Sequence, residues 1–407
     1  MFKNIFYKEE LLIKLFFLLI PLLFVIGPGI LDLFLTISSL VILLLLIQKK
    51  KLIINNKYLI FFFIIYLYLN FVSFISDDIF NSLPRSITFI RYIIIFLVIN
   101  SILINYKIEN LFYLFLSSIF LVYLIVTNQI YQFYFGNDFF GNSIINNSRI
   151  SGFYGEDYIA GQVLYILSLP SLMFTLVISK NKLFNLFFFL TLIIILFGIL
   201  LSGQRTALFN FLLSLALLIL VFKNNFKINF LTFFIASLVS LITFFYFIPS
   251  FYKRFIEVSF SQLSNYLNTS YSAFNETAIN LWLQNPIFGV GLKNYRNMCS
   301  NNLYISTYTG EACSTHPHNI NLEILSELGT IGFLLFFSFF IFYFLNVYKN
   351  IINIDIKLKY YLTPFFLTTI PIVFSILPSG SFFTNAHAIP FWLYFSLASV
   401  SVYFNRN

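Results

Sequence analysis

The stretch GFLLFFSFFIFYF, residues 332–344, decides the fold because it consists almost wholly of aromatic and aliphatic side chains. A helix that is apolar on all sides is either buried in a large core or spans a membrane. The stretch lies in a longer apolar window, residues 321–346, and about 20 such residues cross the hydrocarbon core of a bilayer. We therefore predict a membrane-spanning helix here and apply the same test to the rest of the chain.

The composition of the whole chain points the same way. Of its 407 residues, 59% are hydrophobic and 10% are charged, and the mean hydropathy is +0.89. Soluble domains carry about 25% charged residues. Backbone amides in lipid must bond within their own segment, so we predict an all-α, polytopic transmembrane bundle of about 12 spans. The windows are approximately residues 11–27, 29–47, 58–76, 87–105, 110–127, 158–178, 183–201, 205–222, 228–248, 321–346, 360–377 and 385–403.

These windows divide the chain into three parts. Residues 1–248 hold spans 1–9 together with an outward loop at 128–157, and residues 321–407 hold spans 10–12. Between them, residues 249–320 form a large outward loop that is too short and too polar for an independent domain. We predict short helices lying on the bundle, one of them over SAFNETAINLWLQNP, residues 272–286. This helix is expected to face inward with Ala273, Ala278, Leu281 and Trp282 and to stop at Pro286.

The cations are divided unequally between the two faces. Short loops rich in Lys and Arg stay in the cytoplasm, which places sixteen of the 24 cations and both termini on the cytoplasmic side. Six of the eight outward cations are arginine, whose planar guanidinium binds phosphate oxygens in pairs. The outward face is therefore expected to hold an anion. The eight are Arg85, Arg91, Arg149, Arg205, Lys253, Arg254, Lys293 and Arg296.

A structural role for these arginines is the alternative, and it applies best to Arg85 and Arg254. In that case they would pair with the carboxylates of the same face, which are Asp77, Asp78, Asp138, Glu156, Asp157 and Glu257. The net charge of +9 follows from topology alone, so it predicts no nucleic-acid partner.

Two of the three histidines, His316 and His318, lie directly before the apolar window in the sequence HPHN. The unperturbed pKa of histidine, near 6.5, makes it the usual general base for a hydroxyl at neutral pH. Pro317 suits the first turn of a helix, which would leave His318 and Asn319 at the N-terminal end of that helix. The alternative is an ordinary loop position with satisfied hydrogen bonds.

Two glutamates follow the histidines. Glu323 and Glu327 are four residues apart and share one helix face just inside the membrane boundary, where ionisable groups usually face the protein interior and mark function. We predict no metal site, because the chain has no His-x-x-x-His spacing on a helix face and no closely spaced cysteine pair.

The two cysteines, Cys299 and Cys313, both lie in the large outward loop. An oxidising compartment would permit a disulfide between them, which would close the loop just before the histidines. Spacing alone leaves the bridged and the free state open.

The sequence HPHNINLEILSELGTIGFLLF, preceded by NPIFGVGLKNYR and earlier by SGQRTAL and RISGFYGEDYIAG, resembles the O-antigen ligase and polymerase superfamily. The resemblance covers most of residues 149–335. Its members are polytopic glycosyltransferases of the bacterial inner membrane, with about a dozen spans and a large periplasmic loop between late helices. The resemblance therefore implies the same location, with the active site facing the periplasm.

The resemblance also implies a reaction and residues for it. A glycan on undecaprenyl diphosphate is transferred to an acceptor hydroxyl at the periplasmic face, without metal or other cofactor. His318 would be the base that activates the acceptor, and Arg205 would hold the diphosphate. Arg149 and Arg296 are candidates for the same work. The other expected substrate contacts are His316, Asn319 and Glu323, whereas His387 could be a supporting group, a sugar contact or neither.

Three activities share this chemistry and differ in the acceptor, which is the lipid A core, another lipid-linked repeat or a protein hydroxyl. We favour ligation to the lipid A core because the chain is compact and has one large late loop; polymerisation comes next. A lipid-linked sugar transporter belongs to a different class and would show inverted repeats and charges near the midplane. Here the polar residues crowd one face, and Asp32 is the nearest exception.

Overall fold

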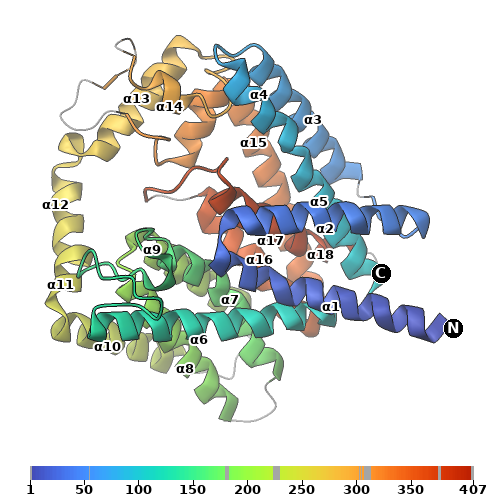
Figure 1. Cartoon of the computed structure of the whole chain (residues 1–407), viewed down its shortest axis with the longest axis horizontal. Coiled ribbons are helices and arrows are strands. Elements are labelled where there is room, and N and C mark those ends of the chain that lie inside the picture. Colours follow the sequence, from blue (N-terminus) through green and yellow to red (C-terminus); the bar gives the residue numbers. More distant parts are fainter. Residues whose placement is uncertain are drawn as a thin grey trace. The chain divides into compact units, whose positions relative to one another are not determined.

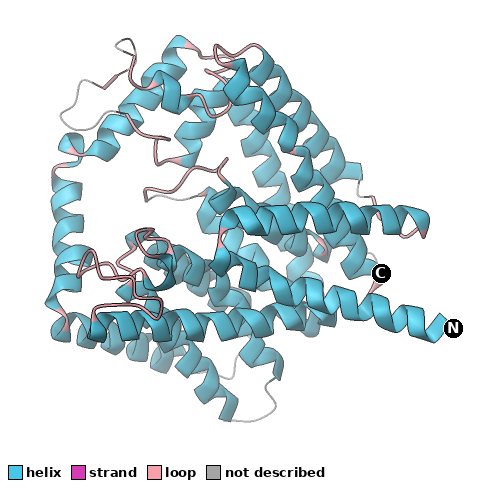
Figure 2. Ribbon diagram, viewed as in Figure 1, coloured by secondary structure: helices cyan, strands magenta, loops and turns pink. Residues whose placement is uncertain are grey.

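A computed structural model describes residues 2–54, 56–178, 183–222, 230–301, 303, 305–306, 313–374 and 377–404. Every regular element within these residues is helical (Figures 1 and 2), so the predicted all-α fold is confirmed. The longer helices are α1 (Phe2–Ile26), α2 (Pro28–Gln48), α3 (Asn56–Phe74), α4 (Ile79–Thr88), α5 (Ile90–Asn105), α6 (Leu111–Phe135), α7 (Ala160–Ile178), α8 (Leu183–Leu201), α9 (Arg205–Phe222), α10 (Phe230–Phe247), α13 (Ser270–Gln284), α15 (Ile320–Asn353), α16 (Ile356–Val373) and α17 (Asn385–Ser399).

Eight helices of the described residues are long and apolar enough to cross a membrane. They cover Pro28–Gln48, Lys57–Phe74, Ile79–Asn105, Ile108–Phe135, Ala160–Ile178, Arg205–Phe222, Ile320–Asn353 and Asn385–Phe404. Two more predicted windows coincide with shorter apolar helices, Leu186–Leu201 and Leu238–Phe247. The last two coincide with α1 and α16. Each of the twelve windows is thus largely helical, while the number of spans stays a prediction.

Large apolar side chains are exposed along these helices, as expected where lipid replaces water. On α2, Leu33 and Leu44 are 61% and 62% exposed. Tyrosine side chains are exposed near helix ends, among them Tyr134 near the end of α6 and Tyr246 near the end of α10. Aromatic residues are enriched at both membrane–water interfaces, so this distribution fits a multi-pass membrane protein.

The chain forms two compact units, and each has its own core. Unit 1 comprises Met1–Leu31, Tyr106–Ser261 and Ile352–Pro371. Within it α6 packs against α1, α7 and α8. The hydroxyl of the buried Tyr165 on α7 donates to the carbonyl of Thr368 on α16 at 2.6 Å. Lipid tails are as apolar as leucine, so close packing and such internal hydrogen bonds hold the helices together.

Unit 2 comprises Asp32–Asn105, Gln262–Ile351 and Ile372–Asn407. Its core is aromatic and lies among α3, α5, α15 and α17. The rings of Tyr343 and Phe395 have centroids 4.0 Å apart. Aromatic pairs contribute about 0.5–1.5 kcal/mol each beyond the burial of their surface. This core ties α15 to α17, and the chain segments that precede these two helices carry the polar cluster described below.

One predicted loop boundary is wrong. Helix α6 continues to Phe135 and ends at Gly136, whose φ of 82° lies in the left-handed region, so the irregular loop begins there and not at residue 128. The side chain of Gln129 donates to the carbonyl of Ile150, and the backbone N–H of Gly152 donates to the side chain of Gln132. Polar residues that suggested a loop are therefore helix residues that hold the loop in place.

The large loop, residues 249–320, contains short helices, as predicted. They are α11 (Pro249–Tyr252), the π-helix η3 (Lys253–Glu257), α12 (Val258–Ser264), α13 and α14 (Tyr295–Met298), together with the 3-10 turn η4 (Tyr266–Asn268). Helix α13 buries Ala273, Ala278 and Leu281, three of the four residues that its sequence predicts to face inward, while the fourth, Trp282, is half-buried. The helix ends just before Pro286. The side of the membrane on which this loop lies stays a prediction.

Candidate functional site

The two predicted histidines lie side by side in unit 2, with ring centroids 4.1 Å apart. The Nε2 atom of His316 lies 3.3 Å from the carbonyl oxygen of Ser379, and its Nδ1 atom lies 2.9 Å from the hydroxyl of Thr315. A carbonyl can only accept, so Nε2 of His316 carries the proton and Nδ1 accepts from Thr315. Both ring nitrogens of His316 are therefore occupied.

His318 is held in an unusual backbone conformation. Its φ of 55° lies in the left-handed region, which is uncommon for residues other than glycine and persists only where the surroundings determine it. Its carbonyl accepts from the N–H of Ser379 at 2.8 Å. Its ring packs against Phe274 and Tyr271 of α13, and Nε2 lies 3.4 Å from the hydroxyl of Ser314. His318 is thus constrained on both its backbone and its ring.

The predicted helix start is wrong by three residues. Helix α15 begins at Ile320, and the side chain of Asn319 accepts from the N–H groups of Asn321 and Leu322 at 3.0 and 3.2 Å. Asparagine is among the best N-cap residues, and a cap here leaves Pro317 and His318 outside the helix. His318 therefore stands just before the first turn, and Asn319 is a cap.

Both histidines are half-buried, and burial is the main reason that their pKa values are lowered from 6.5 to about 4. The charge of Lys293 lowers the pKa of His316 further, and repulsion from His316 does the same for His318. At neutral pH both rings are therefore uncharged. A neutral imidazole can accept a proton, which is the property that general base catalysis requires.

A buried ion pair lies in the same unit. The side chains of Lys293 and Glu323 are each 1% exposed, and Nζ of Lys293 lies 3.3 Å from Oε1 of Glu323. The hydroxyl of Ser381 accepts from Nζ of Lys293 and donates to Oε1 of Glu323. The N–H of Phe382 donates to Oε2 of Glu323 at 2.8 Å. Sequence reasoning missed Lys293 as a site residue, because its charge suggested an outward position and nothing in the sequence shows burial.

Glu327 and His387 complete this polar region. Oε2 of Glu327 accepts from the backbone N–H of Lys293 at 2.7 Å, while its Oε1 has no hydrogen-bond partner within the described residues. The same holds for Nδ1 of His387. Gly380 packs on the imidazole of His387, where a Cβ atom would come within 2.1 Å of the ring. The segment before α17 is thus pressed against His387.

The sequence PIFGVG, residues 286–291, docks on a kink of α15. At the kink Gly329 has a φ of 67°, and the N–H of Gly291 donates to the carbonyl of Glu327 at 2.9 Å. A Cβ atom on Gly289 would lie 2.5 Å from the backbone carbon of Glu327. Only glycine allows two backbones this close. This contact explains the glycine spacing and brings Lys293 to the glutamates.

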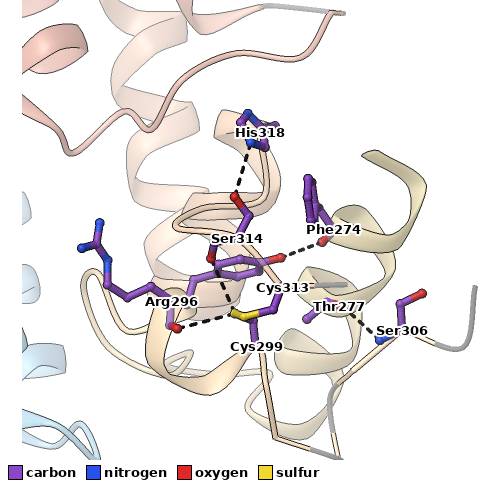
Figure 3. Close-up of a disulfide and its surroundings, with 9 residues drawn as sticks. Phe274, Thr277, Arg296, Cys299, Ser306, Cys313, Ser314 and His318 are labelled. Carbon is purple, nitrogen blue, oxygen red and sulfur yellow. Dashed lines mark hydrogen bonds between the residues drawn. A yellow bond between two sulfur atoms is a disulfide. The ribbon is translucent and has the colours of Figure 1, made fainter. Parts of the chain in front are cut away.

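A disulfide joins Cys299 to Cys313 (Figure 3). Cys299 directly follows α14 and is buried against Ala278 and Leu281 of α13. Cys313 directly precedes Ser314, whose hydroxyl approaches Nε2 of His318. The bridge therefore connects α14 covalently to the segment that carries the histidines.

Arg296 on α14 is the predicted site arginine of unit 2. It is exposed, and Figure 3 shows its side chain pointing away from the disulfide. Its guanidinium makes no hydrogen bond or ion pair with any described residue, and its charge contributes to the lowered pKa of His316. Arg85 on α4 lies within electrostatic range of it. This edge of unit 2 can therefore attract an anion.

The carboxylate of Asp32 on α2 has partners of its own. It lies 3.0 Å from Nε of Arg91 and accepts from the side chain of Asn385 at 3.0 Å. Arg91 thus pairs with Asp32 and not with the carboxylates expected for it. Two of those carboxylates organise the local backbone instead, because Asp78 caps α4 and Asp138 accepts from the N–H of two residues of its loop.

The other two predicted arginines, Arg149 and Arg205, lie in unit 1 around the turn that precedes α9. Arg205 is the first residue of α9 and donates to the hydroxyl of Ser259 at 3.0 Å. Gly203 has a φ of 65°, and a Cβ atom there would come within 2.8 Å of Nε of Arg254 and 3.0 Å of Cγ of Arg149. Nε of Arg254 donates to the carbonyl of Gly203 at 2.6 Å.

Arg254 therefore joins Arg149 and Arg205 at one turn, although a structural ion pair was its favoured role. The useful signal in the sequence was its place among the outward arginines. In the part of the chain that the structure describes, no three His, Cys, Asp or Glu side chains are grouped to hold a metal ion.

Residues 190–337 of the chain match the family model described as O-Antigen ligase. The matched region runs from α8 into α15. It includes Arg205, Arg254, the disulfide and both neighbouring histidines. No curated protein matches the chain. The resemblance to the O-antigen ligase and polymerase superfamily is thus confirmed over this region.

Proposed function

We propose that this chain, whose residues 190–337 are similar to O-antigen ligases, is a membrane glycosyltransferase that moves a glycan from undecaprenyl diphosphate to an acceptor hydroxyl. We place it in the bacterial inner membrane with its site facing the periplasm, and we propose the lipid A core as acceptor. The observation that supports this best is the neutral, constrained His318 in unit 2, within the matched region.

In the proposed reaction His318 accepts the proton of the acceptor hydroxyl. The acceptor oxygen forms a bond to the anomeric carbon of the glycan while the bond from that carbon to the diphosphate oxygen breaks. The diphosphate keeps the electron pair and leaves on its lipid. A positioned general base contributes about 10²–10⁴ in rate. We assign this role to His318 because the resemblance implies it for the second histidine of the HPHN motif, which lies within the matched region.

The arginines would bind the diphosphate. Charge develops on the leaving oxygens, and fixed guanidinium groups stabilise such charge without a change in their own position. The candidates for this role are Arg296 in unit 2 and, in unit 1, Arg149, Arg205 and Arg254, which converge at one turn. His316 and Asn319, which we expected to contact the substrate, instead have structural roles in this proposal. The ring of His316 bonds to Ser379 and Thr315, and the side chain of Asn319 caps α15.

Polymerisation of lipid-linked repeats is the second candidate, because the superfamily includes both activities and the proposed chemistry is the same. The two differ in the acceptor hydroxyl, which is on the lipid A core for a ligase and on another lipid-linked repeat for a polymerase. Transfer to a protein hydroxyl would use the same groups.

The test is the lipopolysaccharide of a strain that lacks this gene. A rough core with polymer accumulated on the lipid carrier indicates a ligase, and a core capped by one repeat indicates a polymerase. Lipopolysaccharide that is unchanged, together with unchanged capsule and glycoproteins, would contradict the proposal. Complementation with His318→Ala should leave the defect in place while the variant is still produced and inserted.

A further inference from the structure

Lys293 connects three chain segments that are distant in the sequence. Its side chain contacts Glu323 on α15 and Ser381 in the segment before α17, and its own backbone belongs to the segment docked at the α15 kink. Its φ of 62° lies in the left-handed region, so the backbone is bent to deliver the side chain inward. At 1% exposure the side chain is not accessible to a substrate.

The segment held by this ion pair is the one that binds both histidines. Ser379 donates its N–H to the carbonyl of His318 at 2.8 Å, and its carbonyl lies 3.3 Å from Nε2 of His316. Two residues later, Ser381 is bonded to both members of the ion pair. A short run of backbone therefore joins the buried charges to the ring of His316 and to the backbone of His318.

We propose that Lys293 and Glu323 are positioning residues, whose ion pair anchors the segment 379–382 so that this segment fixes the ring and backbone of the histidine pair. The inference rests on the proposed function for its catalytic meaning. Neither residue contacts the substrate. Glu323, which we expected to contact it, takes this supporting role because its carboxylate is buried and bonded to Lys293, Ser381 and Phe382.

A buried ion pair such as that of Lys293 and Glu323 fixes the geometry around it more than it adds to stability. Removing two charges from water costs about as much as their attraction returns, so such a pair adds little net stability. The ion pair instead fixes geometry, because a carboxylate and an ammonium with fixed partners hold the groups bonded to them in defined positions. A second-layer hydrogen bond of this kind holds a catalytic side chain in its productive geometry.

The ion pair also affects the charge state of the histidines. The charges that act on His316 come from Lys293 and Arg296, and those that act on His318 come from His316 and Glu323. His387 lies close enough to feel both His316 and Lys293. Loss of the Lys293 charge should therefore raise the pKa of His316, an effect that a purely structural role would not produce.

The experiment compares Lys293→Met with the double variant Lys293→Met/Glu323→Gln in purified full-length protein. The single change leaves Glu323 buried without its cation, so it is expected to fold poorly. The double change removes both charges and should retain the fold, as judged by its thermal unfolding in detergent. Lys57→Met, which removes an exposed lysine of the same unit, is the matched control.

For the double variant we expect kcat for glycan transfer to fall about 10- to 100-fold, the range found at metal sites when the hydrogen-bond partner of a ligand is lost. The KM for the donor should change little, and the titration of His316, followed by NMR of labelled histidine, should move to higher pH. Lys57→Met should match the wild type. A folded double variant with unchanged kcat and unchanged histidine titration would overturn the inference.

Different results would contradict the proposed function and the positioning role of the ion pair. If the wild-type protein transfers no glycan, the proposed function fails, whereas the histidine titration still tests whether the ion pair positions the rings. If the wild type is active and the double variant equals it in both measurements, only the positioning role fails. Rescue of kcat by the reversed pair Lys293→Glu/Glu323→Lys would be further support.

Discussion

His318 brings together three properties at one residue, which are a neutral ring, a left-handed backbone and a position just before a capped helix. Because burial lowers its pKa to about 4, the free protein should keep its base in the active form at pH values where an ordinary histidine is protonated. The acid limb of kcat/KM, which reports the free enzyme, is therefore expected near pH 4 to 5.

Binding of the donor should change the pKa of His318 in a direction that can be predicted. A diphosphate adds negative charge near the ring and favours the protonated form, so the acid limb of kcat should lie at higher pH than that of kcat/KM. Both profiles come from initial rates of glycan transfer between pH 3 and pH 8. An acid limb of kcat/KM at pH 6.5 would contradict the burial that we describe.

The same groups affect stability. The folded protein holds His316 and His318 neutral, while the unfolded chain protonates histidine near pH 6.5, so the unfolded chain binds more protons between pH 6.5 and about 4. Stability should therefore decrease as the pH falls through this window. Thermal unfolding at pH 7 and pH 5 measures it, and the difference should shrink in His316→Asn/His318→Asn.

At the scale of single residues, the sequence is a good guide to chemistry and a poor guide to burial. His316 and His318 were predictable because histidine is rare in this chain and two stand together before an apolar window. The roles of Lys293 and Arg254 were not predictable, since the residue type of a cation in a loop does not show whether it faces water or contacts another segment. The contacts that distinguish them join residues far apart in the chain.

At the scale of elements, the contact between PIFGVG and the α15 kink should tolerate no added side chain. Gly289 has a φ of 69°, and its Cβ would meet backbone atoms of Glu327 at 2.5 Å. We expect Gly289→Ala to lower the free energy of unfolding by about 2 kcal/mol or more, from the strained backbone and the overlap together. Thermal or denaturant unfolding in detergent measures this.

Gly29 on α2 is the matched control for that change. Nothing lies within 4 Å of the position that its Cβ would occupy, and its φ is not in the left-handed region. Gly29→Ala is expected to leave stability unchanged or to raise it by roughly 0.5–1 kcal/mol, because alanine favours a helix over glycine. Equal effects of the two changes on the free energy of unfolding would show that the close backbone contact at Gly289 does not affect stability.

Removal of the disulfide should lower both the stability and the activity of the protein. Cys299 and Cys313 are 14 residues apart, and a bridge that closes a loop of this size stabilises a protein by about 3 kcal/mol. Cys299→Ser/Cys313→Ser should unfold at a lower temperature and should also transfer glycan more slowly, since α14 and the histidine segment lose their covalent connection. Reduction of the wild type should reproduce both effects, and a variant with wild-type values would contradict this role.

Elements were the easiest level to predict. Apolar windows found a helix in each of twelve places, and α13 was predicted with its buried face. The errors arose where polar side chains lie within helices or replace their first turn. Gln129 and Gln132 are buried on α6 because they bond to a loop that returns to them. The N-cap Asn319, and not Pro317, sets the start of α15, since its side chain accepts from two N–H groups of the first turn.

At the scale of the whole molecule, the open predictions concern topology. A single cysteine placed at Leu267, 56% exposed in the large loop, should react with a membrane-impermeant maleimide in intact cells with a permeable outer membrane. One placed at Lys357, which is also exposed, should react only after the inner membrane is broken. The native cysteines are bridged and should stay unlabelled. Labelling at both positions in intact cells would contradict the proposed orientation.

The kink of α15 has a consequence for how the protein is made. The carbonyl of Glu327 receives its hydrogen bond from Gly291, on a segment that the ribosome completes before α15 emerges. The segment that carries Gly291 is therefore already synthesised when α15 emerges, so the hydrogen bond to the Glu327 carbonyl does not depend on any later part of the chain. Segment 379–382, in contrast, follows α15, so the histidine pair reaches its final geometry only near the end of translation.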